Sequence, residues 1–210
     1  KKQMAEGIAN LTENAPQNLF EAMQTSIIYY VMQQMFDGTN LRTLGRLDSL
    51  FYPYYRKESK EIAKELVAAY FKEIDMLGAE ANIPFAIGGT DKDGKSMLNE
   101  LSYVFLETYK TVGTSNTKFH ILYEENTPDD FTENAFKGIR DGNNSIVFMS
   151  DKKIIESLER LREEHDKAAN YHVVGCYECG GEGVLTFSCK ARGNIPMVLE
   201  FVLIKGRTFL

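Results

Sequence analysis

The chain has 210 residues, of which 43% are hydrophobic and 26% charged, and its net charge at pH 7 is −6. A chain of this size can bury roughly 70% of the surface that it exposes when unfolded, which is enough for one domain. No block of Lys and Arg stands out, so we expect no nucleic-acid partner. No apolar run approaches the ~20 residues of a membrane helix, and residues 1–4 lack a hydrophobic signal core. We therefore expect a cytoplasmic protein with no membrane partner.

The first third of the chain predicts two helices. Apolar side chains recur every three or four residues in the first, which Asn14 and Pro16 open and Asp37 ends. The second covers residues 57–77 and ends at Gly78, which acts as a C-terminal cap. Its predicted apolar stripe is Ile62, Leu66, Ala69 and Ile74.

Two polar residues and an aromatic segment lie between these helices. Arg46 and Asp48 are expected to pair with each other, or with neighbouring backbone, in a structural role. Residues 51–55 are four aromatic residues around Pro53. This density and the central proline predict a packed, irregular segment.

From residue 83 onward, short apolar runs alternate with helix-periodic segments. The expected strands are residues 83–87, 119–123, 145–149 and 171–175. The expected helices are residues 97–112, a helix capped by Thr127 in a capping box and ending at Asp141, and a helix that Ser150 caps. Such alternation predicts right-handed βαβ units and a parallel sheet.

The end of the chain predicts a returning strand over residues 184–188 and a last helix over residues 197–204. The Gly88–Gly89 pair predicts a tight turn between strand and helix rather than a phosphate or calcium loop. Four parallel strands with two flanking helices would leave the sheet with open edges. We therefore expect part of a larger α/β architecture.

The candidate catalytic residues are Cys176 and Glu178, which follow the fourth predicted strand. Ligands in parallel α/β sheets gather beyond the carboxyl ends of the strands. In an extended backbone, residues i and i+2 point to the same side, so this thiol and carboxyl group are predicted to face one space while Tyr177 points away. A thiol beside a carboxyl group favours sulfur chemistry assisted by proton transfer.

Simpler interpretations of these residues remain open. Cys176 and Cys179 can be buried or incidental thiols, and Glu178 a solvated surface acid. With Cys189 and His172 the two cysteines can also form a zinc site, although the spacing fits no usual zinc pattern. We expect no metal, and the sequence assigns no role to either His120 or His165.

Several segments in one order resemble the glycyl radical enzymes, the family of pyruvate formate-lyase and related dehydratases and decarboxylases. The segments are Asn18-Leu19-Phe20-Glu21-Ala22, Gly45-Arg46-Leu47-Asp48 with Tyr52-Pro53-Tyr54-Tyr55, Ile87-Gly88-Gly89-Thr90-Asp91, Asn99-Glu100-Leu101-Ser102-Tyr103, Gly175-Cys176-Tyr177-Glu178 and Asn194-Ile195-Pro196-Met197-Val198-Leu199-Glu200. Together they cover nearly the whole chain.

The resemblance implies a ten-stranded α/β barrel of two half-barrels with the cysteine loop at its centre. It implies that Cys176 becomes a thiyl radical that abstracts hydrogen from a small-molecule substrate, and that Glu178 transfers a proton. The resemblance also implies a glycyl radical, installed by a radical S-adenosylmethionine activating enzyme, and a homodimeric full-length protein. No cofactor is expected to be bound by the chain itself.

The chain departs from the family pattern at Cys179, where the dehydratases often have proline, and at two further places. The Arg-Val-x-Gly-Tyr/Phe segment that carries the radical is missing, so residues 1–210 are expected to be the central part of a longer protein, inactive alone, without its N-terminal helical region and C-terminal glycyl radical segment. Cys176 is followed by Tyr177, where pyruvate formate-lyase has a second cysteine. This favours a dehydratase, carbon–nitrogen or carbon–carbon lyase, or decarboxylase. The alternatives are a pyruvate formate-lyase-like acyltransferase and a non-catalytic or zinc-binding module.

Overall fold

The computed structural model describes residues 2–37, 42–77, 83–112, 117–183 and 195–206. A parallel three-stranded sheet in the order β1–β2–β3 lies at its centre. Its strands are β1 (Ile83–Gly88), β2 (Thr117–Tyr123) and β3 (Ile146–Ser150). The parallel sheet expected from the alternation of strands and helices is confirmed for these three strands.

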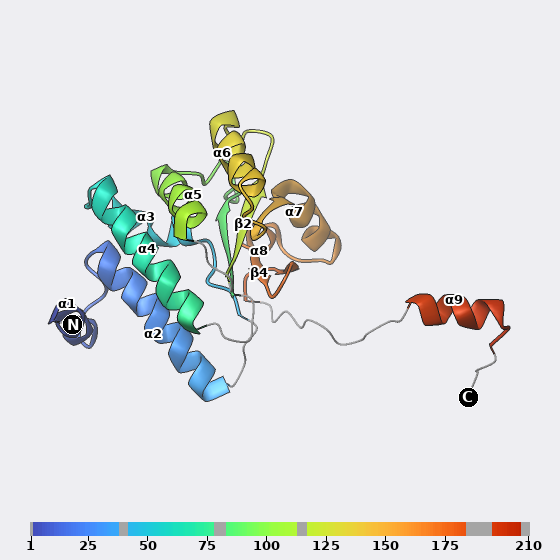
Figure 1. The fold of residues 1–210 in the computed structure, drawn as a ribbon, viewed down its shortest axis with the longest axis horizontal. Helices are drawn as coiled ribbons and strands as arrows, with labels where there is room; N and C mark the ends of the chain where they lie inside the picture. Colours follow the sequence, from blue (N-terminus) through green and yellow to red (C-terminus); the bar gives the residue numbers. More distant parts are fainter. Residues whose placement is uncertain (1, 38–41, 78–82, 113–116, 184–194, 207–210) are drawn as a thin grey trace.

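The described part of the chain also contains helices, most of which begin or end within a few residues of the predicted bounds. In chain order they are α1 (Lys2–Leu11), α2 (Leu19–Asp37), α3 (Leu47–Tyr55), α4 (Lys60–Leu77), α5 (Glu100–Val112), α6 (Asp129–Arg140), α7 (Asp151–Arg160), α8 (His165–Ala169) and α9 (Ile195–Leu203). Figure 1 shows α2 and α4 side by side, and α5 lies between α4 and α6.

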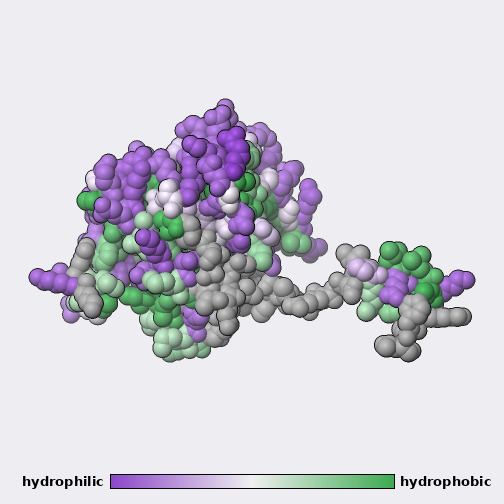
Figure 2. Space-filling view, in the orientation of Figure 1, coloured by the Kyte–Doolittle hydropathy of each residue, from purple (hydrophilic) through white to green (hydrophobic). Residues whose placement is uncertain are grey.

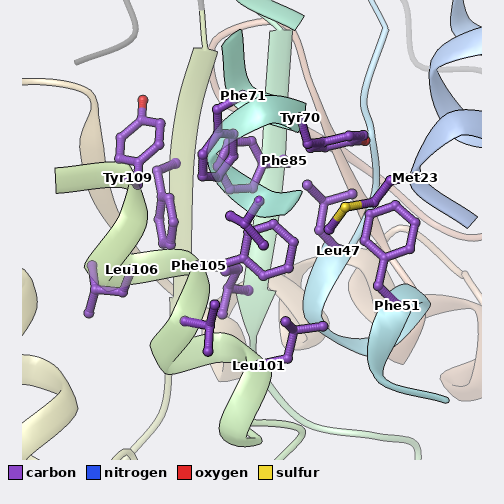
Figure 3. Packing of buried hydrophobic residues seen from close by; sticks show 14 of the residues in the cluster. Met23, Leu47, Phe51, Tyr70, Phe71, Phe85, Leu101, Phe105, Leu106 and Tyr109 are labelled. Atoms are coloured by element: carbon purple, nitrogen blue, oxygen red, sulfur yellow. The ribbon is translucent and has the colours of Figure 1, made fainter. Parts of the chain in front are cut away.

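An aromatic core fixes α4 and α5 on one face of the sheet (Figure 3). The ring of Phe85 on β1 lies 4.9 Å from that of Phe119 on β2 and 5.3 Å from that of Phe71 on α4. Tyr109 on α5 meets Phe71 edge-on at 5.2 Å. Each such pair adds roughly 0.5–1.5 kcal/mol to the effect of buried area. This face of the sheet is therefore packed against helices, and the opposite face remains for contacts with other segments.

The opposite face of the sheet packs against the segment that carries the candidate cysteine. Successive side chains of a strand point to opposite faces. Ala86 and Leu122, each one residue from a core side chain, contact Tyr171, Val173 and Leu158 instead. Even-numbered side chains of β1 and β2 therefore face this segment.

The predicted fourth parallel strand is wrong. Residues 172–174 form β4 (His172–Val174), which pairs antiparallel with β5 (Glu178–Gly180) in a separate two-stranded sheet. The reason is Gly175, whose φ of +63° turns the chain back on itself. The edge of β1 is instead extended by residues 44–46, where Leu44 donates to the Pro84 carbonyl and Ala86 donates to the Gly45 carbonyl.

The aromatic segment of residues 51–55 is helical, so the prediction of an irregular segment is wrong. It belongs to α3, which contains Pro53. Leu47, Phe51 and Tyr55, spaced by four, are buried on one face of this helix. Burial of such side chains contributes roughly 1.5–3 kcal/mol each, which together exceeds the roughly 3 kcal/mol cost of an interior proline.

The buried face of α4 lies one residue away from the predicted stripe. Ala63, Val67 and Tyr70 are buried, whereas Ile62 is 48% exposed. Ile74 is buried as expected. Gly78, the expected cap, lies outside the described residues.

The predicted side-chain caps do not form. The Thr127 hydroxyl accepts a hydrogen bond from the Glu124 N–H at 3.0 Å instead of capping α6, and Ser150 makes no side-chain cap at α7. The predicted strand at residues 184–188 lies outside the described residues. The last helix is confirmed as α9, whose apolar side chains are exposed and gather as a hydrophobic patch in Figure 2. None of the helices in the described part of the chain is long and apolar enough to cross a membrane.

Candidate active site

Cys176 lies at the tip of a β-hairpin. The hairpin consists of β4, a turn over residues 175–177, and β5, with Val174 opposite Glu178. Cys176 is exposed at this tip. The backbone is therefore turned at Cys176, and the extended geometry from which the sequence analysis placed Cys176 and Glu178 is wrong.

The Glu178 carboxylate folds back under the turn. Its Oε2 accepts hydrogen bonds from the backbone N–H of Cys176 at 2.9 Å and of Tyr177 at 3.0 Å. Two donors on one oxygen leave Oε1 outside these bonds. Cys176 and Glu178 are thus brought together, through the Cys176 backbone.

Gly175 makes this arrangement possible in two ways. Its φ of +63° lies in the left-handed region that other residues avoid. A Cβ at this position would lie 2.8 Å from Glu178 Oε2. Any other residue here would therefore strain the turn and displace the carboxylate.

The Glu178 carboxylate is held in its ionised form. Burial acts to raise the pKa of Glu178, but the backbone N–H groups of Tyr177, Glu178 and Cys176 outweigh it and lower the pKa. Burial alone would raise this pKa towards neutral pH, but the turn supplies N–H donors that stabilise the charged form. In this state Glu178 can accept a proton.

Cys179 differs from Cys176 in exposure and ionisation. It is half-buried, and burial followed by the Glu178 charge raises the pKa of Cys179 to about 11. Its thiol lies 3.6 Å from the Tyr177 carbonyl. Cys179 is therefore a protonated thiol at neutral pH.

His120 reaches the hairpin from the sheet, and the sequence analysis gave it no role. It is fully buried on β2, on the same face as Leu122. Its Nε2 lies 3.0 Å from the Cys176 carbonyl oxygen, and its ring meets that of Tyr177 edge-on at 5.8 Å. The sequence did contain one indication of this role, because His120 is a polar residue within an otherwise apolar run, residues 119–122.

A buried polar network at the carboxyl ends of β1 and β3 anchors the chain that enters the hairpin. Asp151 accepts hydrogen bonds from the Thr90 N–H at 2.8 Å and from the Tyr171 hydroxyl at 2.9 Å. Arg46 lies over the Tyr171 ring, donates to the Ala169 carbonyl at 2.7 Å and forms an ion pair with Asp151 at 4.0 Å. The sequence analysis missed Asp151 and Tyr171.

Asp48 ties α3 to β1 in the same region. It is fully buried and accepts from the Gly88 N–H at 2.9 Å and the Ser102 hydroxyl at 2.7 Å. Burial raises the pKa of Asp48 to about 6, although these donors and Arg46 act in the opposite direction. The structural role expected for Arg46 and Asp48 is confirmed. Asp48 accepts from the Gly88 N–H and the Ser102 hydroxyl, whereas Arg46 donates to the Ala169 carbonyl and pairs with Asp151.

The tight turn expected at Gly88–Gly89 is also confirmed. Both residues have a φ of +77°. A Cβ on Gly89 would lie 2.8 Å from Asp151 Oδ1, so this glycine lets β1 approach the network closely.

Two open cavities flank this region. One of about 520 Å³ runs along β3 and α7 and is lined by Tyr177 and Cys179 on the hairpin side. The other, of about 620 Å³, lies at the ends of β2 and β3 and is lined by charged side chains including Glu124, Lys152 and His165. Cys176 and Glu178 line neither.

Within the part of the chain that the structure describes, no group of three or more His, Cys, Asp or Glu side chains is arranged to hold a metal ion. Cys189, one ligand of the alternative zinc site, lies outside that part.

Comparison with known proteins agrees with the resemblance. The family model of pyruvate formate lyase-like proteins matches residues 2–210. Among curated relatives, a probable dehydratase, YbiW, of Escherichia coli is 25% identical over 89% of this chain and 26% of its own length. The isethionate sulfite-lyase of Oleidesulfovibrio alaskensis is 25% identical over 97% of this chain and 27% of its own length.

Solved structures give the same result for the fold. The B12-independent glycerol dehydratase of Clostridium butyricum superposes with a TM-score of 0.76 and 22% identity, over 85% of this chain and 25% of that protein. A glycyl radical enzyme of Archaeoglobus fulgidus gives a TM-score of 0.73 and 21% identity, over 80% of this chain and 24% of that protein. The chain thus spans about a quarter of the length of its relatives. With a family model that matches it from residue 2 to residue 210, the chain belongs to the pyruvate formate lyase-like family of glycyl radical enzymes.

Proposed function

We propose that this chain is the part of a longer glycyl radical enzyme that carries the hydrogen-abstracting cysteine, and that Cys176 is that cysteine. The observation that carries the proposal is the hairpin, which presents Cys176 at an exposed tip while Glu178 binds its backbone N–H. The relatives' fourfold greater length supports a larger protein in which residues 1–210 form one partial domain. Three parallel strands and the added edge at residues 44–46 support assignment to part of a ten-stranded α/β barrel.

The exposed tip also fits an approach by a second segment of such a protein. A glycyl radical, installed by a radical S-adenosylmethionine activating enzyme, would supply the unpaired electron by taking the hydrogen atom of the Cys176 thiol. Every later step uses groups of this chain. The hairpin orients the sulfur, and Glu178 holds the turn and accepts protons.

The proposed reaction moves one hydrogen atom to sulfur and back. The Cys176 sulfur takes a hydrogen atom from a substrate carbon, which leaves an S–H bond and a carbon radical. Glu178 accepts the proton of a substrate hydroxyl and passes it to the group on the neighbouring carbon, which departs with the electron pair of its bond. The product radical then takes the hydrogen atom back from Cys176, so the thiol is catalytic and the reaction needs no added reductant or oxidant. A positioned acid or base contributes ~10²–10⁴-fold to such a rate.

The substrate class follows from the relatives' activities. The relatives include an isethionate sulfite-lyase, a (2S)-3-sulfopropanediol dehydratase, a trans-4-hydroxy-L-proline dehydratase and a 4-hydroxyphenylacetate decarboxylase. Most of these substrates are small and carry a hydroxyl group. We infer a small hydroxylated substrate and an elimination, with carbon–carbon cleavage or decarboxylation as other members of the same lyase chemistry. Tyr177 after Cys176 disfavours the acyl transfer of pyruvate formate-lyase.

The proposal also covers the compartment, the oligomeric state and the partners of the enzyme. We infer a cytoplasmic homodimer whose other partners are its substrate and the activating enzyme. A non-catalytic or zinc-binding module would need neither of these.

The test uses the full-length protein, activated anaerobically with its activating enzyme. We expect a glycyl radical signal in electron paramagnetic resonance and consumption of at least one of isethionate, (2S)-3-sulfopropanediol, trans-4-hydroxy-L-proline and glycerol. Unactivated protein is the matched control and should consume none. A protein that shows no radical after activation, or that binds stoichiometric zinc through Cys176 and Cys179, would refute the proposal.

A further inference from the structure

His120 contacts the hairpin from outside it. The ring is fully buried on β2, and its Nε2 lies 3.0 Å from the Cys176 carbonyl oxygen. A carbonyl oxygen can only accept a hydrogen bond, so Nε2 must carry the hydrogen. Burial keeps the ring neutral, because it lowers the pKa of His120 to about 4. His120 is therefore a neutral imidazole that donates through Nε2.

The other ring nitrogen of His120 costs stability. With Nε2 protonated in the neutral ring, Nδ1 is an acceptor. It is buried and has no hydrogen-bond partner among the described residues. A buried acceptor without a donor is unfavourable. A phenylalanine ring would fill the same space without this cost, so stability alone does not explain a histidine at this position.

The two backbone groups of Cys176 are both bound by side chains. Its N–H donates to Glu178 Oε2 at 2.9 Å, and its carbonyl accepts from His120 Nε2 at 3.0 Å. Glu178 belongs to the hairpin and moves with it. His120 belongs to the central sheet, whose other face is locked by the aromatic core. Of these two contacts, the one from His120 fixes the tip relative to the sheet.

We propose that His120 is a positioning residue that fastens the Cys176 peptide to the central sheet, and so sets where the thiol is presented. The contact between the His120 and Tyr177 rings supports the same arrangement, because it holds the residue after the cysteine against the same side chain. The consequence for catalysis rests on the proposed function. The fastening itself is a property of the hairpin and does not depend on the radical.

Three variants of the full-length protein separate positioning from stability. His120→Phe keeps the ring and removes both nitrogens, whereas His120→Gln keeps an N–H donor at the end of the side chain. Tyr109→Phe is the control, because it removes a hydroxyl that donates to the Thr117 carbonyl at 2.9 Å on the opposite side of the sheet. Hydrogen–deuterium exchange of unactivated protein reads the hairpin amides directly, without substrate.

We expect His120→Phe to speed exchange at the amides of Cys176 and Tyr177 about fivefold, the factor that loss of one ordinary hydrogen bond produces, with the unfolding temperature unchanged or higher. His120→Gln should restore slow exchange, and Tyr109→Phe should leave the hairpin amides unchanged. Unchanged hairpin exchange in His120→Phe would overturn the proposal. Equal acceleration in Tyr109→Phe would also overturn it, because the effect would then be general loosening.

The activated protein gives a second readout. With whichever of the four probe substrates the wild-type protein consumes, His120→Phe should lower kcat about tenfold or more at unchanged KM and unchanged radical content, and His120→Gln should recover most of it. An unchanged kcat in His120→Phe with faster hairpin exchange would show that the fastening does not serve the chemistry, and would overturn that part. If no probe is consumed by wild-type protein, the proposed function is at fault and the exchange experiment still decides the fastening.

Discussion

Substitution of Gly175 by alanine tests the turn that presents the cysteine. The new Cβ meets two obstacles, a φ of +63° and an oxygen of Glu178 at 2.8 Å. The left-handed backbone alone costs a non-glycine residue about 1–2 kcal/mol. Displacing the carboxylate also weakens its two hydrogen bonds to the N–H groups of Cys176 and Tyr177. Bonds to a charged group contribute about 1.5–3 kcal/mol each, and less here because Glu178 is only half-buried.

The expected total for Gly175→Ala is about 3 kcal/mol of local stability, or roughly a 100-fold faster exchange of the Cys176 and Tyr177 amides. Hydrogen–deuterium exchange of the full-length protein, followed at these two amides, measures it. Gly183→Ala is the matched control. Gly183 has a φ of +75° and no atom within 4 Å of an added Cβ, so it experiences the backbone strain without the collision.

A double-mutant cycle isolates the collision. In the Glu178→Ala background, Gly175→Ala should cost only the backbone strain of about 1–2 kcal/mol, because the carboxylate is gone. Additive effects of the two substitutions would contradict the described geometry. So would equal effects of Gly175→Ala and Gly183→Ala on the hairpin amides.

Three further predictions follow from the same region. Asp151→Asn should cost about 3 kcal/mol in a thermal unfolding experiment, because it leaves the buried Arg46 without its ion pair, and an unchanged unfolding temperature would contradict this. Burial lowers the pKa of His120 from 6.5 to about 4, so the folded protein favours the neutral ring. The free energy of unfolding should therefore fall by up to about 3 kcal/mol as the pH drops from 6.5 towards 4. This part of the pH dependence should be absent in His120→Phe, and parallel stability curves for the two proteins would refute it. Glu178→Gln should lower kcat ~10²–10⁴-fold with substrate still bound, and near-normal turnover would mean that Glu178 only shapes the turn.

The sequence was sufficient to predict the elements with strong periodicity. The strands at residues 83–87, 119–123 and 145–149 are apolar runs between helical segments, and their parallel pairing follows from that alternation. The last helix also lies within about two residues of its predicted bounds. These features depend on local patterns, which one sequence contains in full.

The hairpin was less accessible because it depends on one backbone angle. The apolar run before Gly175 is as typical of a buried parallel strand as of a short antiparallel one. The positive φ of Gly175 and the carboxylate beneath the turn decide the outcome, and neither is visible in a pattern of apolar residues. The same limit applied to Pro53, whose helix forms because a stripe spaced by four is buried.

The residues around the site were missed because they are distant along the chain. His120 lies 56 residues before Cys176, and Tyr171 lies 20 residues after Asp151. No spacing rule connects such pairs, since their proximity results from the packing of the sheet against the hairpin. Cys176 and Glu178 could be proposed from the sequence because they lie two residues apart and match a family segment.

We propose that the Cys176 thiol abstracts the substrate hydrogen. The most direct test of this proposal compares Cys176→Ala and Cys179→Ala in the activated full-length protein, with the glycyl radical quantified by electron paramagnetic resonance beside substrate consumption. We expect Cys176→Ala to retain the radical signal and to lose all turnover, whereas Cys179→Ala should keep most of its activity, because Cys179 is a half-buried, protonated thiol. Substantial turnover by Cys176→Ala, or an equally severe loss in Cys179→Ala, would contradict it.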